Sequence, residues 1–356
     1  MAAKRGNRRA VETLLVFGAD LERGCAGICD CLIPAMRNDR GLNDEPLPPS
    51  WSALHVAICF GHEDIVRQLL GWGAKCLKPG KLVNRVPVLH SAASRGNVAM
   101  CQLLLDHHLA KDLPGFDSQR ASVMLAQEDS RGLRALDHTV AACHTRTTGS
   151  WLLDHGVDPF QHPAGRERFF LAPLNFLCFW GRYRDAQYLL ARLPCTPAPA
   201  KLTAALQLCF MPPSEGTARP QLASRPLCQF LDENMSKGCK RTWPTSDGEE
   251  DLTCLVKQLL EAGADPAIVL DPSSDHTYIL SIKPDDSALT LAAAASQRAA
   301  LEVLLDARVL LEPDLMDAGG PGLLTVAMRG LRRVGFNEPR TSPFSSGGLR
   351  SRRQCR

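Results

Sequence analysis

Apolar residues recur along the chain in a pattern that predicts pairs of helices. In four segments a short stretch rich in small residues is followed by Gly or Ser and then by a second apolar stretch. In the clearest segment Ile65, Val66, Leu69 and Leu70 form one broad apolar stripe at helical spacing. The Gly between two such stretches permits a tight turn, because it adopts backbone conformations that other residues avoid. Each segment therefore predicts a helix–turn–helix unit.

The four segments share one register. In each, a Leu is followed seven positions later by Gly or Ser: Leu54 and Gly61, Leu89 and Gly96, Leu174 and Gly181, Leu289 and Ser296. The helix ends are also marked. Ser52 and Ser287 are expected to cap first helices, and Pro173 suits a first helical position. Gly18 and Gly263 are expected to end second helices.

Two segments, "SALHVA" from Ser52 and "PVLHSA" from Pro87, are the clearest copies of a short motif that recurs at the start of the units. They resemble the T-P-L-H-x-A signature of the ankyrin repeat, a unit of about 33 residues. "APLNFL", "SALTLA" and "RALDHT" are looser copies. The resemblance implies an all-α ankyrin-repeat solenoid of stacked helix–turn–helix units with short hairpin loops, and minor strand content at the loop tips. It also implies that His55 and His90 hydrogen-bond the backbone between units.

The spacing of the units predicts the domain organisation, with about six degenerate repeats. A unit that begins at Leu136 needs about one extra residue before Gly156. Another unit is split, with its first helix expected at 203–210 and its second at 251–266. The predicted parts are a partial repeat (1–20), a Cys- and Pro-containing insertion (21–50), repeats (51–200), a repeat (201–266) split by a disordered insertion (about 211–250), C-terminal repeats (267–333) and a disordered basic tail (334–356).

The first residues, "AAKRGN", match "AASRGN" from Ala92 onward. The chain therefore begins inside a repeat, after the point where a first helix would start. Two explanations stay open: an adapted terminal repeat with a polar outer face, or a truncated start with further repeats upstream.

Composition narrows the class of protein. Among 356 residues, 45% are hydrophobic and 22% are charged, which is ordinary for a soluble globular chain. The net charge of +3 gives no reason to expect a nucleic-acid partner. The sequence contains no run of about 18 apolar residues, so we expect no membrane-spanning helix. The 14 cysteines stand mostly alone within apolar stretches. We therefore expect a reducing compartment, cytoplasmic or nuclear.

Few motifs suggest a catalytic, phosphate-binding or metal site. Cys25, Cys29 and Cys31 could bind zinc with His55, but they lack a paired C-x2-C spacing, and we favour scattered thiols in an insertion. The run at 319–322, "GGPG", lacks the Lys and hydroxyl of a phosphate loop. Catalytic signatures such as G-x-S-x-G, H-E-x-x-H and the D-H-H-C run of ankyrin-bearing acyltransferases do not occur. We expect no enzymatic activity, cofactor or resident metal.

A candidate binding site follows from the register. In ankyrin repeats the last residues of the first helix face a concave groove that contacts partners. The two positions before the turn place basic and aromatic residues there: Lys4, Arg5, Phe60, Arg95, Phe179 and Trp180. Arg and aromatic side chains are common interface anchors. The alternative is that the aromatic side chains only pack against neighbouring repeats.

The expected function is a non-enzymatic scaffold or adaptor that binds a protein or peptide partner, with acidic and apolar character, in the groove. We expect no small-molecule substrate and no membrane contact. Two alternatives stay open. The chain could be a nuclear transcriptional co-regulator, since eight Arg follow from Arg329 in the tail. It could also be the regulatory part of a larger multidomain enzyme or channel, and fold alone does not name the partner.

Overall fold

The structure is a computed structural model, and it describes ten ranges of the chain: 1–24, 52–76, 87–110, 117–129, 132–161, 171–193, 196–210, 246–267, 287–295 and 297–311. Regular secondary structure in these ranges is helical throughout, without a strand, so the predicted strand content at loop tips is wrong for this part of the chain. No helix in the described ranges is long and apolar enough to cross a membrane.

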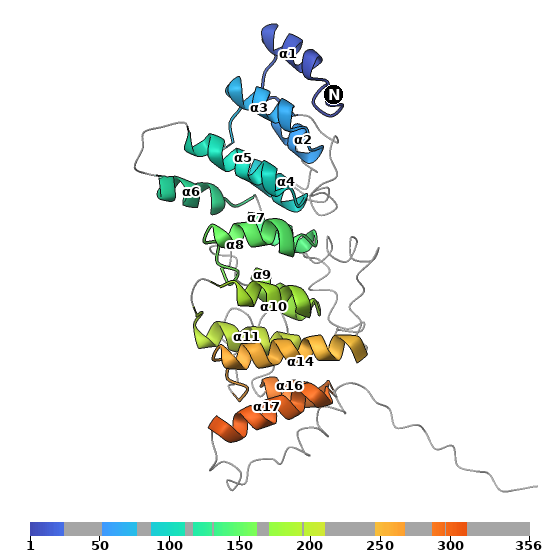
Figure 1. The fold of residues 1–356 in the computed structure, drawn as a ribbon, viewed down its shortest axis with the longest axis vertical. Coiled ribbons are helices and arrows are strands. Elements are labelled where there is room, and N and C mark those ends of the chain that lie inside the picture. The colour runs from blue at the N-terminus through green and yellow to red at the C-terminus, as the bar shows by residue number, and fades with distance from the viewer. Residues whose placement is uncertain are drawn as a thin grey trace, which may run out of the picture.

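The helices form two layers that run the length of a stack (Figure 1). The first helices of the pairs pack side by side in one layer: α2 (Ala53–Cys59), α4 (Val88–Ser94), α7 (Ala135–Ala141), α9 (Pro173–Phe179), α11 (Pro199–Cys209) and α16 (Ala288–Ala294). The second helices form the other layer: α1 (Arg8–Val16), α3 (Glu63–Gly71), α5 (Val98–Leu109), η1 with α8 (Thr145–Gly149, Ser150–Asp154), α10 (Tyr183–Ala191), α14 (Ser246–Glu261) and α17 (Arg298–Leu311). Each unit can bury its apolar face only against a neighbour, which gives a quasi-linear stack.

The predicted helix ends are confirmed. The hydroxyl of Ser52 accepts the backbone N–H of His55, and that of Ser287 accepts the backbone N–H of Thr290. Pro173 occupies the first turn of α9, where the missing N–H costs nothing. Past the second helices, glycines at 18 and 263 have φ of 78° and 104°, the left-handed conformation of a helix C-cap.

In six of the described second helices a register Leu packs into the continuous core. These six side chains are at most 1% exposed: Leu69, Leu104, Leu152, Leu189, Leu259 and Leu304. They and the apolar residues around them join a single cluster along the stack. Stability of the solenoid therefore depends on this shared register.

In two repeats a polar side chain after the turn bonds the backbone of the preceding repeat. His62 follows the turn after α2, and its Nε2 donates to the carbonyl of Lys4 at 3.0 Å. Arg182 follows the turn after α9, and its guanidinium donates to the carbonyl of Val140 in the preceding repeat. These contacts fix the ends of the first helices relative to one another.

The repeat that begins at α7 contains the extra residue that its sequence spacing predicts. Its second helix starts as the π-helix η1 and continues as α8. A π turn accommodates an inserted residue without breaking the helix. In this turn Thr148 is buried, and its hydroxyl donates to the carbonyl of Ala93 in the preceding repeat at 2.8 Å.

Two loops between helices differ from the sequence expectation. The long connection between α5 and α7 contains a further helix, α6 (Asp117–Leu125), which packs on α5. Met124 and Leu125 of α6 are buried in the core. The second helix of the split repeat, α14, begins at Ser246, ahead of the predicted start at residue 251, and thus includes the last residues of the predicted insertion.

The turn after α7 holds Cys143 where four other repeats have Gly. Gly6, Gly61, Gly96 and Gly181 have φ between 68° and 73°, and Cys143 has φ of 63°. A side chain in this left-handed conformation costs about 1–2 kcal/mol. Cys143→Gly removes that cost but adds freedom to the unfolded chain, so we expect a gain of about 1 kcal/mol. Urea unfolding of the intact chain measures it, and an unchanged or lower midpoint would contradict the strain.

Candidate functional site

The first helices of three repeats end at the residues that the sequence assigns to a binding groove. Phe60, Arg95 and Trp180 are the C-caps of α2, α4 and α9. A left-handed Gly follows each of them and reverses the chain. Because α2, α4, α7 and α9 pack in sequence, these caps lie in a row along the stack. We call the six predicted residues the first-helix strip: Lys4, Arg5, Phe60, Arg95, Phe179 and Trp180.

A cation and an aromatic ring lie together at the N-terminal end of the strip. The Nζ of Lys4 is 5.2 Å from the ring centroid of Phe60, within the range of a cation–π contact. Phe60 is 39% exposed, and its ring stacks with His62 at 6.5 Å between centroids. Since His62 also bonds the carbonyl of Lys4, it holds both residues in place. Sequence reasoning missed His62, whose only signal is its position directly after the turn Gly.

Arg95 is the next member of the strip and is exposed. It ends α4, and His144 of the next repeat lies close to this turn. Burial, with a further contribution from the charge of Arg95, holds the pKa of His144 below its ordinary value. The positive charge at Arg95 is therefore part of the field at the junction of these two repeats.

The aromatic pair of the strip is partly buried. Phe179 and Trp180 form an edge-to-face contact with 5.7 Å between ring centroids. Trp180 also packs against Phe176 of its own helix, at 6.0 Å. Both side chains contact the apolar core while keeping some exposed surface. Ala142 caps α7, so a small residue separates the basic end of the strip from this aromatic end.

The signature His residues are structural. His90 is fully buried, and its Nε2 donates to the carbonyl of Leu133 in the next loop at 3.0 Å, which confirms the expected bond between units. Burial lowers the pKa of His90 to about 3. The Nδ1 of His55 pairs with the hydroxyl of Ser52 in its own repeat, at 2.9 Å.

Near His90, the side chains of His138 and Asp129 form a buried ion-pairing contact. His138 donates from Nε2 to a carboxylate oxygen of Asp129 at 2.9 Å, and both side chains are buried. Burial would raise the pKa of Asp129, but the hydrogen bond and charge of His138 lower it overall. Asp129 also accepts the backbone N–H of Leu133. The cluster therefore holds the loop before α7 against α4.

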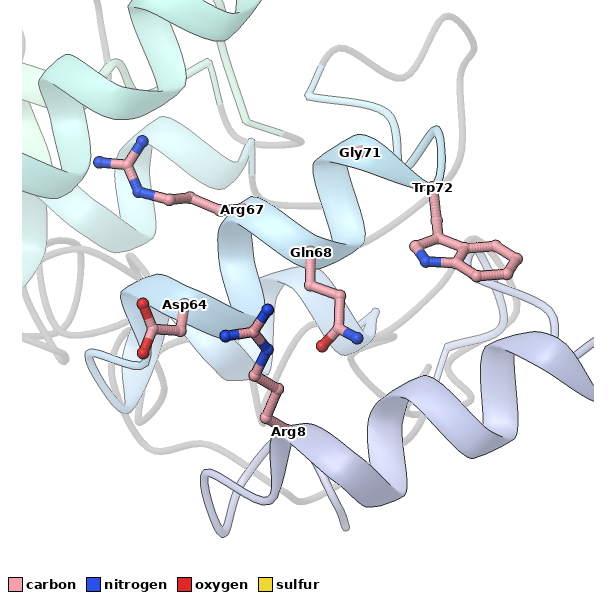
Figure 2. A pocket seen from close by; sticks show the side chains of 6 residues that line it. All are labelled: Arg8, Asp64, Arg67, Gln68, Gly71 and Trp72. Carbon is pink, nitrogen blue, oxygen red and sulfur yellow. The ribbon is translucent and has the colours of Figure 1, made fainter.

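Shallow hollows lie on the other layer, between second helices. The hollow between α1 and α3 has a volume of about 670 Å³, and Figure 2 shows its lining. Arg8 of α1 and Asp64 of α3 project into the space between the two helices, and Trp72 lies at one end (Figure 2). A second hollow, of about 590 Å³, lies between α3 and α5. Gly71 lines both hollows. A Gly within a second helix, where a side chain is missing, is the sequence signal that could have predicted them.

Several sequence candidates fall outside the described residues. They are the cysteines at 25, 29 and 31, the "GGPG" run at 319–322 and the basic tail. Among the described residues no group of three or more His, Cys, Asp and Glu side chains is arranged to hold a metal ion. Of the cysteines in the described ranges, five are buried: Cys59, Cys76, Cys101, Cys178 and Cys209.

The comparisons with known proteins agree with the geometry. Residues 1–113 and 54–162 match a family model described as ankyrin repeats in three copies. The chain therefore contains ankyrin repeats over residues 1–162, and only ankyrin repeats are detected in it, without an enzyme domain. Such repeats generally mediate protein–protein interaction.

Among solved structures, one similar chain is the ankyrin repeat domain of Bcl-3, described as a unique member of the IkappaB protein family. The two share 17% sequence identity with a TM-score of 0.48, over 85% of this chain and 96% of that chain. No curated protein matches the sequence.

Proposed function

We propose that this chain is a non-enzymatic scaffold or adaptor that binds a partner protein through the first-helix strip. The observation that carries the proposal is the exposed Phe60 ring with the ammonium of Lys4 beside it. An aromatic ring and a cation held together at the end of a helix are the kind of pair that anchors interfaces. Arg95 follows in the next repeat, at the same register.

The chemistry of the strip favours a partner segment with both acidic and apolar side chains. Lys4, Arg5 and Arg95 are exposed cations, and a carboxylate facing them would gain charge-assisted hydrogen bonds. Phe60 and the exposed edges of Phe179 and Trp180 offer apolar area. An extended segment or a helix of the partner could lie along the row of helix ends, since the caps follow one another from repeat to repeat.

The test uses a partner isolated by affinity purification with the intact chain. We expect Arg95→Ala and Trp180→Ala each to weaken its binding at least about tenfold, as for interface anchors. Matched controls come from the second layer. Trp72→Ala removes the exposed Trp that caps α3, and Arg298→Ala removes an exposed Arg of α17.

Titration calorimetry measures the affinities, and thermal unfolding verifies that each variant remains folded. The controls should bind as the wild type does. Unchanged affinity of folded Arg95→Ala and Trp180→Ala variants would contradict the assignment of the strip.

A further inference from the structure

The chemistry of the first-helix strip changes at the repeat that begins at α7. The two positions before the turn of this repeat are Ala141 and Ala142, and both are partly exposed. The repeat before it presents the exposed Arg95, and the repeat after it presents Phe179 and Trp180. A cation is therefore followed by a position without a large side chain and then by an aromatic pair. The small side chain of Ala142 leaves room for a large side chain of a partner.

The spacing of these positions is fixed by contacts between neighbouring repeats. His62 and Arg182 each bond a backbone carbonyl of the preceding repeat. His144 lies against the turn at Gly96, since a Cβ there would come within 2.5 Å of the Nδ1 of His144. The first helices behind these turns also contact one another along the stack. Because the axes of packed helices lie about 8–10 Å apart, each step along the strip is roughly 8–10 Å.

A polyproline II segment matches this step. It rises about 3.1 Å per residue with three residues per turn, so one turn advances about 9 Å and every third side chain points to the same side. An α-helix rises about 1.5 Å per residue and would need about six residues per step, which is not a whole number of turns of about 3.6 residues. Regular secondary structure in the described ranges is helical, so a partner β-strand would find no strand edge there to pair with.

We propose that the first-helix strip binds a partner segment in the polyproline II conformation, with one anchoring side chain per repeat. The inference rests on the proposed function and gives its partner a shape and a motif. Charge complementarity places an acidic residue opposite Arg95. Three residues further along the segment, a Leu-sized side chain lies over Ala142. After three more, a Pro packs on the exposed part of Trp180, as prolines do in aromatic-lined grooves.

Phe60 extends the motif by one step on the other side of Arg95. Its ring is 39% exposed, and the Nζ of Lys4 lies 5.2 Å from the ring centroid. A Pro three residues before the acidic residue packs on this ring. The motif read along the strip is Pro-x-x-Glu-x-x-Leu-x-x-Pro, which spans roughly 28 Å in a polyproline II helix.

The test measures binding of labelled synthetic peptides to the intact chain by fluorescence anisotropy. The probe carries the motif with Pro at each x, and it is made in both chain directions, of which the tighter is used. The first control has Lys in place of Glu. The second inserts one Pro between Glu and Leu, which turns the later anchors by about 120° away from the strip. The third carries the same anchors at heptad spacing on an α-helix.

We expect the probe to bind at least about tenfold more tightly than each control peptide. The change of Arg95→Glu should weaken the probe about tenfold and tighten binding of the Lys peptide, because the charges then match the other way. Ala142→Phe should also weaken the probe about tenfold, because it fills the room for Leu. Trp72→Ala, in the second layer, should bind the probe as the wild type does, and thermal unfolding verifies that each variant is folded.

Three outcomes would overturn the inference: no binding of the probe, equal binding of the peptide with the inserted Pro, or tighter binding of the helical peptide. The proposed function is judged separately, by the isolated partner. If Arg95→Ala and Trp180→Ala weaken that partner while the inserted Pro has no effect on peptide binding, the strip is a binding site but not for a polyproline II segment. If neither variant weakens the partner, the proposed function itself fails.

Discussion

Replacing Gly96 by Ala is expected to destabilise the fold by about 3 kcal/mol. Gly96 has φ of 68°, and an L side chain in this conformation costs about 1–2 kcal/mol. The new Cβ would also lie 2.5 Å from Nδ1 of His144, so the imidazole of the next repeat must move. Displacing a packed side chain adds about 1–3 kcal/mol. Chemical denaturation of the intact variant measures the change in the free energy of unfolding.

Gly61→Ala is the matched control for this prediction. Gly61 has φ of 73°, but a Cβ there meets no atom within 4 Å. Only the backbone cost of about 1–2 kcal/mol should remain. The difference between the two variants therefore isolates the contact between the turn after α4 and His144. Equal destabilisation of the two variants would show that this contact does not hold the repeats together.

His90→Gln is expected to remove a large part of the acid sensitivity of the protein. Because burial lowers the pKa of His90 to about 3 in the folded state, the unfolded chain takes up the proton first, near pH 6.5. The stability linked to this group is fully present above pH 6.5 and is lost as the pH falls toward 3. One group contributes about 1.4 kcal/mol per pH unit, hence roughly 4–5 kcal/mol over this window.

The charged neighbours of His90 make a comparison with the wild type necessary. His138, Asp129 and His55 all act on it electrostatically. Burial raises the pKa of Asp137 to about 6, which opposes the effect of His90, because the folded state then binds this proton more readily below pH 6. The contribution of Asp137 cancels when stability is compared at each pH between the wild type and His90→Gln. Gln already occupies the equivalent register as the buried Gln207.

Unfolding free energies between pH 7 and pH 3 test this prediction. The gap between the two proteins should shift by several kcal/mol in favour of His90→Gln as the pH falls. Ser91→Ala is the control, since Ser91 is a buried neighbour that does not titrate, and it should keep the pH dependence of the wild type. Parallel pH profiles of His90→Gln and the wild type would contradict a buried neutral His90.

The features that sequence predicted correctly are those that depend on local chemistry. Ser52 and Ser287 cap helices because a hydroxyl can reach the free N–H groups of the first turn. Pro173 and the turn glycines follow equally local backbone rules. The extra residue of the α7 repeat was also visible as a spacing, and only its form, the π-helix η1, needed the structure.

Contacts between distant residues could not be predicted in this way. Helix α6 is weakly patterned, and its burial comes from packing against α5. The hydrogen bond from His62 to Lys4 joins residues 58 positions apart in the sequence, and no local sequence pattern predicts it. Leu14 of α1 is 53% exposed although Leu69 in the same register of α3 is buried, so the neighbours of a residue, and not its type alone, decide its burial.

The first-helix strip was predictable in register but not in exposure. The turn Gly locates the helix end, so the positions of Phe60, Arg95 and Trp180 follow from the sequence. How much of each ring stays exposed depends on neighbouring helices. Trp180 partly packs on Phe176 and the core, whereas Phe60 keeps more of its surface free beside Lys4.

Hydrogen exchange of the complex with its isolated partner tests the central claim most directly. If the partner lies along the first-helix strip, backbone amides at the ends of α2, α4 and α9 should exchange more slowly in the complex. The turns at 60–62, 95–97 and 180–182 should show the strongest protection, and the outer faces of α3 and α5 should remain unchanged. Protection confined to α3 and α5, with the three turns exchanging as in the free chain, would contradict the account.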